Sequence, residues 1–214
     1  MSRARWKTCR NSSKFPESNP VLEPSGLYYP NRLARYFILA MDDVMGKSGM
    51  SMVLNLAGLD GAQLPPDNLE RQYDFASLSA ISRALEEMYG ARGGRGLALR
   101  IGRSCFAQGM KSFGALGGAQ DAAFRALPMD ARCRLGLTAL ADIFTRFSDQ
   151  KSTLTEQDKT YQFTVDSSPI AWGRTADKPV CHAIVGILQE SLRPCCCGFG
   201  GSSTCGRAKG CPSS

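Results

Sequence analysis

The sequence predicts an α+β fold, in which helices pack on a twisted antiparallel sheet. Apolar residues recur at helical spacing over most of residues 31–147, and the period then becomes strictly alternating at Tyr161, Phe163 and Val165. Helices that precede a run of strands favour an α+β fold over a doubly wound parallel sheet. The 214 residues suit one domain of this kind.

The first ordered segment is expected to begin at Tyr28, directly before a helix. The apolar face of this helix recurs every three or four residues and Gly46 ends it. A short apolar segment, residues 50–59, is predicted to form a second helix. The first apolar face consists of Leu33, Phe37, Ala40, Met41 and Val44.

Asp74 is the expected N-cap of the next helix, which Gly90 ends. We predict that residues 93–96 form a turn with Arg95 at its rim, followed by the longest helix over residues 97–116. That helix carries Gly102 and Gly109 on one face, where each glycine costs about 0.5–1 kcal/mol relative to alanine. Another part of the chain is therefore expected to pack very closely against this face.

The remaining expected elements are a short helix, a longer helix capped by Asp130, a β-hairpin, a third strand and a last helix. The hairpin is predicted from its alternating pattern, with its turn at residues 157–159. In chain order these elements span residues 119–127, 130–147, 152–156, 160–165, 169–174 and 181–192.

The two ends of the chain differ in composition from residues 28–193, the predicted domain. Residues 1–27 mix polar and charged residues without apolar periodicity and are predicted to be disordered. In the last segment, residues 194–214, fourteen of 21 residues are Gly, Ser or Cys, and we predict a disordered tail.

Residues 1–27 and 193–214 each carry a net charge of +3, which leaves the body nearly neutral at +1. A nucleic-acid partner is not expected, because such proteins cluster Lys and Arg where they grip phosphates.

No uncharged apolar run reaches the length of a bilayer span, and no apolar segment follows the basic N-terminus. A cytoplasmic protein without a membrane partner is therefore expected. Only Cys105, Cys133 and Cys181 lie in the body, and with no export signal a disulfide framework is not expected.

No catalytic residues emerge from the pattern. His182 is the only histidine, and no nucleophile elbow accompanies it, so we interpret it as a residue in the first turn of a helix. Glu86 and Glu87 are interpreted as solvated carboxylates on an exposed helix face. The sequence thus predicts a protein that is not an enzyme.

Aromatic and methionine residues on the later helices allow two interpretations. They form either a plain core or the lining of a pocket for a small apolar ligand, since both use the same residue types. If a pocket exists, the expected ligand-binding residues are Phe106, Met110, Phe113, Phe144 and Trp172.

Five segments together resemble the bacterial hydrocarbon-binding proteins with a 4-vinyl-reductase domain, over roughly residues 28–193. No segment is diagnostic by itself, and the resemblance depends on their order and continuity. The segments are residues 29–35, 55–59, 89–97, 147–150 and 172–182.

This resemblance implies helices on a twisted antiparallel sheet and the binding of a small apolar molecule. In sensor relatives it also implies a zinc ion held by one Cys before the late helix, then by a Glu and two Cys in a final hairpin. Cys181 matches the first ligand, and the others have no match. Our hypothesis is a frameshift near Arg193 that replaces the last strands, so no cofactor is expected in the chain as written. Residues 1–27 are likewise expected to come from an early start codon.

The expected function is therefore binding or sensing of a small hydrocarbon or aromatic ligand without catalysis. Two alternatives stay open. One is an accessory factor or reductase for a tetrapyrrole vinyl group in bacteriochlorophyll synthesis. The other is an interaction subunit that forms a homodimer without ligand.

Overall fold

The computed structural model describes residues 22–61, 63–112, 122–157, 160–176 and 178–196. These residues confirm the α+β class. Two antiparallel strand pairs accompany the helices, β1 with β2 and β3 with β4, where the sequence predicted one sheet. The elements are β1 (Tyr28–Pro30), α1 (Asn31–Leu56), β2 (Arg71–Asp74), α2 (Phe75–Ser112), α3 (Ala122–Ala126), α4 (Met129–Phe147), β3 (Ser152–Gln157), β4 (Thr160–Val165) and α5 (His182–Cys196).

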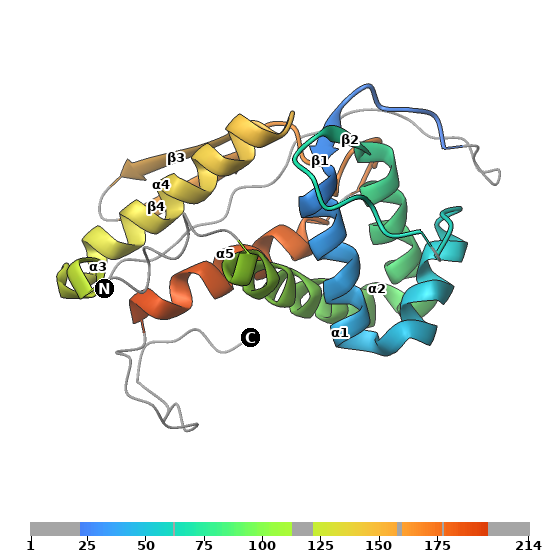
Figure 1. Ribbon diagram of the computed structural model, residues 1–214, viewed down its shortest axis with the longest axis horizontal. Coiled ribbons are helices and arrows are strands. Elements are labelled where there is room, and N and C mark those ends of the chain that lie inside the picture. The colour runs from blue at the N-terminus through green and yellow to red at the C-terminus, as the bar shows by residue number, and fades with distance from the viewer. Residues whose placement is uncertain (1–21, 62, 113–121, 158–159, 177, 197–214) are drawn as a thin grey trace.

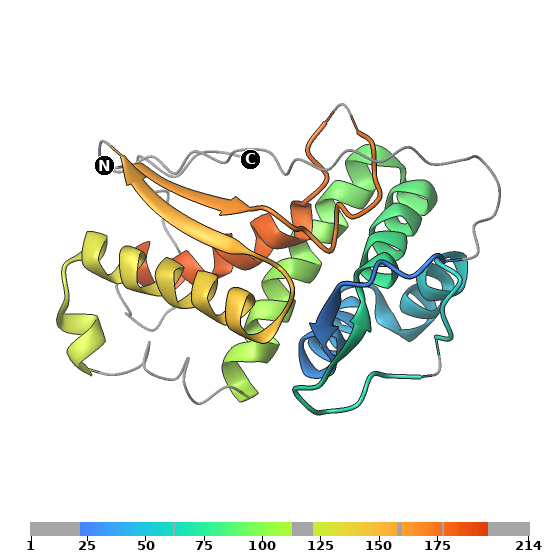
Figure 2. The ribbon, with the colours of Figure 1, turned by 90° about the horizontal axis from the view of Figure 1, so that it is seen from above.

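The elements form two groups joined by crossing helices. α1, β1 and β2 lie at one end of the molecule, while α4 and the β3–β4 hairpin lie at the other (Figure 1). α5 and the second half of α2 cross between them, and the hairpin lies alongside α4 (Figure 2). The core that joins the two groups is continuous, and its most buried large side chains include Phe75, Met41, Ile81, Ile101 and Leu137.

Both long helices bend at a glycine. Gly46 in α1 has φ of 75°, and Gly90 in α2 has φ of 71°. Residues with a Cβ atom rarely adopt a positive φ, whereas glycine adopts it freely because it has no side chain. The first helical segment therefore ends at Gly46 in α1 and at Gly90 in α2, as predicted. After each of these bends the backbone becomes helical again in a new direction.

The segment at residues 93–96 is helical, so its prediction as a turn was wrong. Gly94 is present because this segment packs closely against the helical segment before Gly90, and not because the chain turns here. A Cβ atom on Gly94 would lie 2.8 Å from both the Glu86 Cα atom and the Leu85 carbonyl oxygen. Glycine is required here because two backbone segments touch, while the change of direction happens at Gly90.

The start of α2 is held by Asp74, as predicted. Its carboxylate accepts the backbone N–H of Ala76 at 2.7 Å. It also accepts the backbone N–H and the hydroxyl of Ser25. Residues 22–27, which were assigned to the disordered extension, therefore belong to the fold, and Leu22 packs against the core. Residues 194–196, which were assigned to the disordered tail, form the end of α5, so that part of the prediction was wrong. Residues 1–21 and the rest of the predicted tail, residues 197–214, lie outside the described residues.

The hairpin matches its prediction. β3 and β4 pair in antiparallel register from Ser152 with Val165 to Gln157 with Thr160. Asp130, however, does not cap α4, whose N-cap is Pro128 without a side-chain hydrogen bond. Asp130 lies in the first turn instead.

The predicted strand at residues 169–174 is also wrong. These residues form consecutive turns, in which the N–H of Ala171 binds the Ser168 carbonyl and that of Arg174 binds the Ala171 carbonyl. Pro169 has no N–H to offer a neighbouring strand. Ser168 to Ala171 are also buried one after another, without the alternation of a strand.

Candidate ligand cavity

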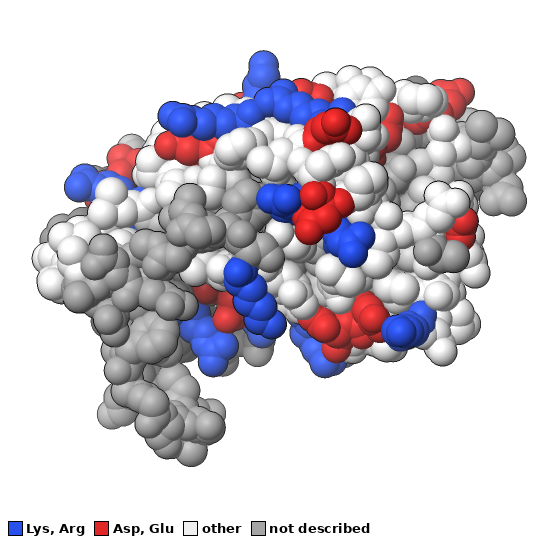
Figure 3. Space-filling view, viewed as in Figure 1, with Lys and Arg blue, Asp and Glu red and all other residues white. Residues whose placement is uncertain are grey.

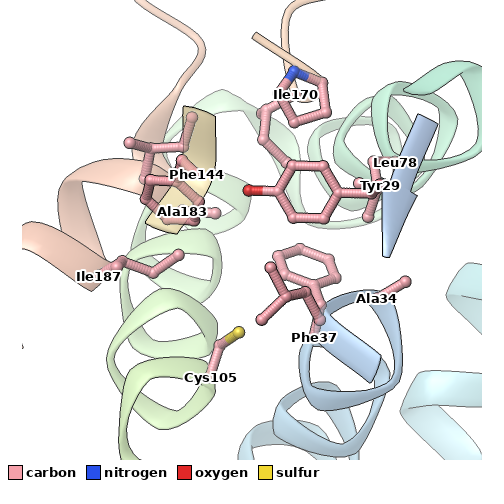
Figure 4. Close-up of a pocket in the computed structure, with 12 residues that line it drawn as sticks. Tyr29, Ala34, Phe37, Leu78, Cys105, Phe144, Ile170, Ala183 and Ile187 are labelled. Atoms are coloured by element: carbon pink, nitrogen blue, oxygen red, sulfur yellow. The ribbon is translucent and has the colours of Figure 1, made fainter. Parts of the chain in front are cut away.

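A cavity of about 50 Å³ lies where the two groups of elements meet. Its lining is almost wholly apolar and comes from β1, all the long helices and the turn at 169–170 (Figure 4). The lining residues are Tyr29, Leu33, Ala34, Phe37, Leu78, Cys105, Phe144, Pro169, Ile170, Ala183, Ile184 and Ile187.

Tyr29 is the residue that ties β1 to this cavity. The residue is 8% exposed, and its ring stands edge-on to Phe75, with ring centroids 5.8 Å apart. It also packs against Phe144 at 6.3 Å. Figure 4 shows its hydroxyl pointing across the cavity toward Phe144 and Ala183. Aromatic contacts from two helices therefore fix the direction of the hydroxyl.

The crossing of α2 and α5 forms another side of the cavity. A Cβ atom on Gly102 would lie 2.0 Å from the Ala183 carbonyl oxygen, and one on Gly186 would lie 2.2 Å from the Leu99 carbonyl oxygen. The predicted close approach is confirmed for Gly102 and wrong for Gly109, where a Cβ atom would meet nothing within 4 Å among the described residues. Because the backbones touch, Ala183 and Cys105 are brought to the same space.

One hydrogen-bonded chain leads out of the cavity. The Tyr29 hydroxyl donates to Oε1 of Gln150 at 3.0 Å, and Nε2 of Gln150 donates to the Ser152 hydroxyl at 2.9 Å. Gln150 is fully buried, and its backbone N–H binds the Ser148 hydroxyl. Next to it, the Asp149 carboxylate accepts the backbone N–H of Tyr28 at 2.7 Å. These bonds fasten β1 to the connection between α4 and β3.

Both ionisable groups of the lining are held neutral at ordinary pH. Burial raises the pKa of Tyr29 well above its usual value, and the neighbouring Cys105 adds to the rise. Burial also raises the pKa of the Cys105 thiol to about 12. The cavity is thus an uncharged, apolar space with a phenol and a thiol at its wall.

A polar cluster outside the cavity holds the turn that closes it. Arg174 donates from Nη2 to the Glu86 carboxylate at 2.5 Å and from Nη1 to the Ser82 hydroxyl at 3.0 Å. The Ser79 hydroxyl binds the Trp172 carbonyl at 2.6 Å. Glu86 is therefore paired and part-buried, where the sequence predicted a solvated carboxylate. We call these contacts the Arg174 clasp, because they fix the turn that carries Ile170.

His182, the first residue of α5, lies beside this clasp. Burial lowers its pKa, the Arg95 guanidinium lowers it further, and Arg174 acts in the same direction. Glu86 and the Pro179 carbonyl oppose the shift. Its place at the helix start agrees with the sequence interpretation.

Of the predicted ligand-binding residues, Phe144 lines the cavity. Phe106 and Trp172 are half-buried and pack against the core without lining it. Met110 is half-buried on α2 and does not line it either. Phe113 lies outside the described residues. Sequence reasoning missed Tyr29, Phe37 and Cys105, although the resemblance included residues 29–35.

Cys181 does not meet the requirements of a zinc site in the described part of the chain. Its buried sulfur lies 3.2 Å from the Ser168 hydroxyl. No group of three metal-ligating side chains occurs among the residues that the structure describes. A closed structural zinc site takes four ligands, so the described residues supply too few.

The surface gives no single-sign field on the face seen in Figure 3, where Lys and Arg lie interspersed with Asp and Glu. None of the described helices combines the length and the apolar character that crossing a membrane requires. Comparisons with family models, curated proteins and solved structures found no match for this chain.

Proposed function

We propose that this chain binds one small, neutral, mainly apolar molecule in the cavity beside Tyr29 and Phe144, without chemically changing it. The observation that carries the proposal is the apolar space itself. Filling apolar volume in a protein core contributes about 24 cal/mol per Å³. A ligand that fills this 50 Å³ space should therefore stabilise the fold by about 1 kcal/mol through packing alone.

The pKa values support binding without catalysis. General acids and bases work best when their pKa lies near the operating pH. The Cys105 thiol, with a pKa of about 12, and the Tyr29 phenol, shifted upward, are far from that range. Neither is poised to exchange protons with a ligand.

The size of the cavity bears on the two alternatives. A tetrapyrrole is many times larger than 50 Å³, so the cavity does not favour that substrate. A subunit that only dimerises has no need of space at its core and would be more stable with the space filled. Sensing or sequestering a ligand of a few heavy atoms is the function that uses the cavity.

We extend the proposal to the family that the sequence resembles. An antiparallel hairpin packed on α4, and an apolar space among β1, the long helices and the turn at 169–170, support a hydrocarbon-binding protein of the 4-vinyl-reductase type. The hairpin itself contributes no residue to the lining of this space. Membership remains our proposal, supported by the order of the five segments along the chain.

Xenon tests the function directly, because it is apolar and small and occupies dry apolar cavities. We expect xenon to shift the methyl NMR signals of Ile170, Ile184 and Ile187 in a saturable way. Phe144→Trp should fill the space and abolish the shift. Tyr89→Trp is the matched control, since Tyr89 is 40% exposed and lies outside the cavity.

A second filling variant, Cys105→Leu, guards against misfolding of the first. The proposal is wrong if xenon shifts no cavity methyl group in the wild type, or if Phe144→Trp and Cys105→Leu both fold and leave the shifts intact.

A further inference from the structure

The Tyr29 hydroxyl is the strongest polar group at the cavity wall. Its proton is directed to Oε1 of Gln150, at 3.0 Å. A phenol oxygen can accept a hydrogen bond as well as donate one. Among the described residues, no group donates to this oxygen. Tyr29 is 8% exposed, so a buried acceptor faces the cavity without a partner.

Gln150 keeps the hydroxyl in this role. The amide is fully buried between the Tyr29 hydroxyl and the Ser152 hydroxyl. A ligand carbonyl that took the Tyr29 proton would leave Oε1 of Gln150 buried without a donor. Buried polar groups left unpaired are costly, so acceptor ligands are disfavoured.

The rest of the wall excludes charge. Cys105 is held as the neutral thiol, and the other lining residues are apolar. Burying an isolated charge in such surroundings is far more costly than burying a neutral donor. The complementary ligand therefore has an apolar body and one neutral O–H or N–H group.

We infer that the cavity selects small neutral molecules that carry one hydrogen-bond donor, such as short branched alcohols, and that Tyr29 is the residue that recognises the donor. This inference rests on the proposed function and specifies its ligand class. The volume limits the apolar body to a few heavy atoms, because each water-sized site takes roughly 10–15 Å³.

Three probes of similar size separate the possibilities by NMR titration. They are 2-butanol with a donor, 2-butanone with an acceptor only, and 2-methylbutane with neither. We expect the wild type to bind 2-butanol roughly 3- to 10-fold more tightly than 2-butanone, the range of one neutral hydrogen bond. Tyr29→Phe should abolish this preference and leave 2-methylbutane within twofold. Tyr161→Phe is the matched control, because the Tyr161 hydroxyl binds the Asp130 carbonyl instead.

Gln150→Met gives a second, opposite readout. Without the glutamine acceptor, the Tyr29 proton turns toward the cavity, and the preference should move toward 2-butanone by a similar factor. The inference is overturned if 2-methylbutane binds but the alcohol and ketone bind equally in the wild type. It is also overturned if Tyr29→Phe folds and keeps the alcohol preference. Failure of xenon and all three probes to bind would instead refute the proposed function.

Discussion

The Cα atom of Gly102 in α2 lies so close to α5 that a Cβ atom on Gly186 would come within 3.1 Å of it. Nothing except backbone separates the two helices at this point. The crossing sets the distance between Cys105 and Ala183 and hence the width of the cavity. Its residues are therefore the most direct place to test the packing.

Gly102→Ala should destabilise the protein by about 1–3 kcal/mol, because the new methyl group collides with the Ala183 carbonyl. Gly109→Ala is the matched control seven residues further along α2, where a Cβ atom meets nothing within 4 Å. There the helix propensity of alanine should stabilise the fold by roughly 0.5–1 kcal/mol. Urea unfolding measures both. Equal effects of the two changes would contradict the close crossing.

The Arg174 clasp should contribute measurably to stability, because it is largely shielded from water. The side chains of Arg174 and Glu86 are 13% and 29% exposed. A double-mutant cycle with Arg174→Met and Glu86→Gln should give a coupling free energy of roughly 1.5–3 kcal/mol.

The exposed pair of Arg193 and Glu190 serves as the comparison for the clasp. The Arg193 side chain is 71% exposed, so the same cycle there should give about 0–1 kcal/mol. If the coupling free energy of Arg174 with Glu86 is no larger than that of Arg193 with Glu190, the Arg174 clasp does not stabilise the fold as predicted.

His182 should make stability depend on pH in a defined direction. The pKa of His182 is lowered in the folded state by burial and then by Arg95, from 6.5 in the unfolded chain. The unfolded chain therefore takes up the proton first as the pH falls. Neutral His182 therefore contributes its full share to the free energy of unfolding above pH 6.5. This share is lost as the pH falls from 6.5 through the lower pKa of the folded state.

Urea unfolding at pH 7.5 and 5.5 checks this expectation against His182→Gln. The wild type should lose more stability over this interval than the variant. If the wild type loses no more stability than His182→Gln between these two pH values, the folded protein accepts the protonated imidazole as readily as the unfolded chain does, and the prediction is wrong.

Cys105 should resist alkylation in the folded protein. With a pKa of about 12, only about one thiol in 10,000 is ionised at pH 8, and the thiolate is the reactive form. We expect its labelling by iodoacetamide, followed by peptide mass spectrometry, to be at least 100-fold slower than in urea. Labelling within tenfold of the unfolded rate would mean that the thiol is not held neutral at the cavity wall.

Local sequence patterns predicted most of the helices and strands. Which residues line the cavity depends instead on packing between segments that are far apart in the sequence. The hairpin was predictable because alternation at Tyr161, Phe163 and Val165 needs only neighbours along the chain. The bends at Gly46 and Gly90 were predictable for the same reason. Cys105 and Phe106 both suit an apolar helix face, and only the rotation of α2 at its crossing with α5 places Cys105 toward the cavity.

Gly186 illustrates what single-sequence reasoning misses. Its partner Gly102 lies on another helix, and no local pattern connects the two positions. The predicted strand at 169–174 failed for a related reason. Its apolar residues are buried because the turn closes the core beside Ile170, and such tertiary burial resembles a buried strand in sequence.

The contacts of Tyr28 and Tyr29 with Asp149 and Gln150 join residues 121 positions apart. Contacts between such distant residues are slow to form, because a long loop must close before they give any stabilisation. During synthesis β1 emerges long before the connection between α4 and β3. We therefore expect the wall of the cavity to be among the last parts to assemble, with its apolar lining exposed to other chains until then.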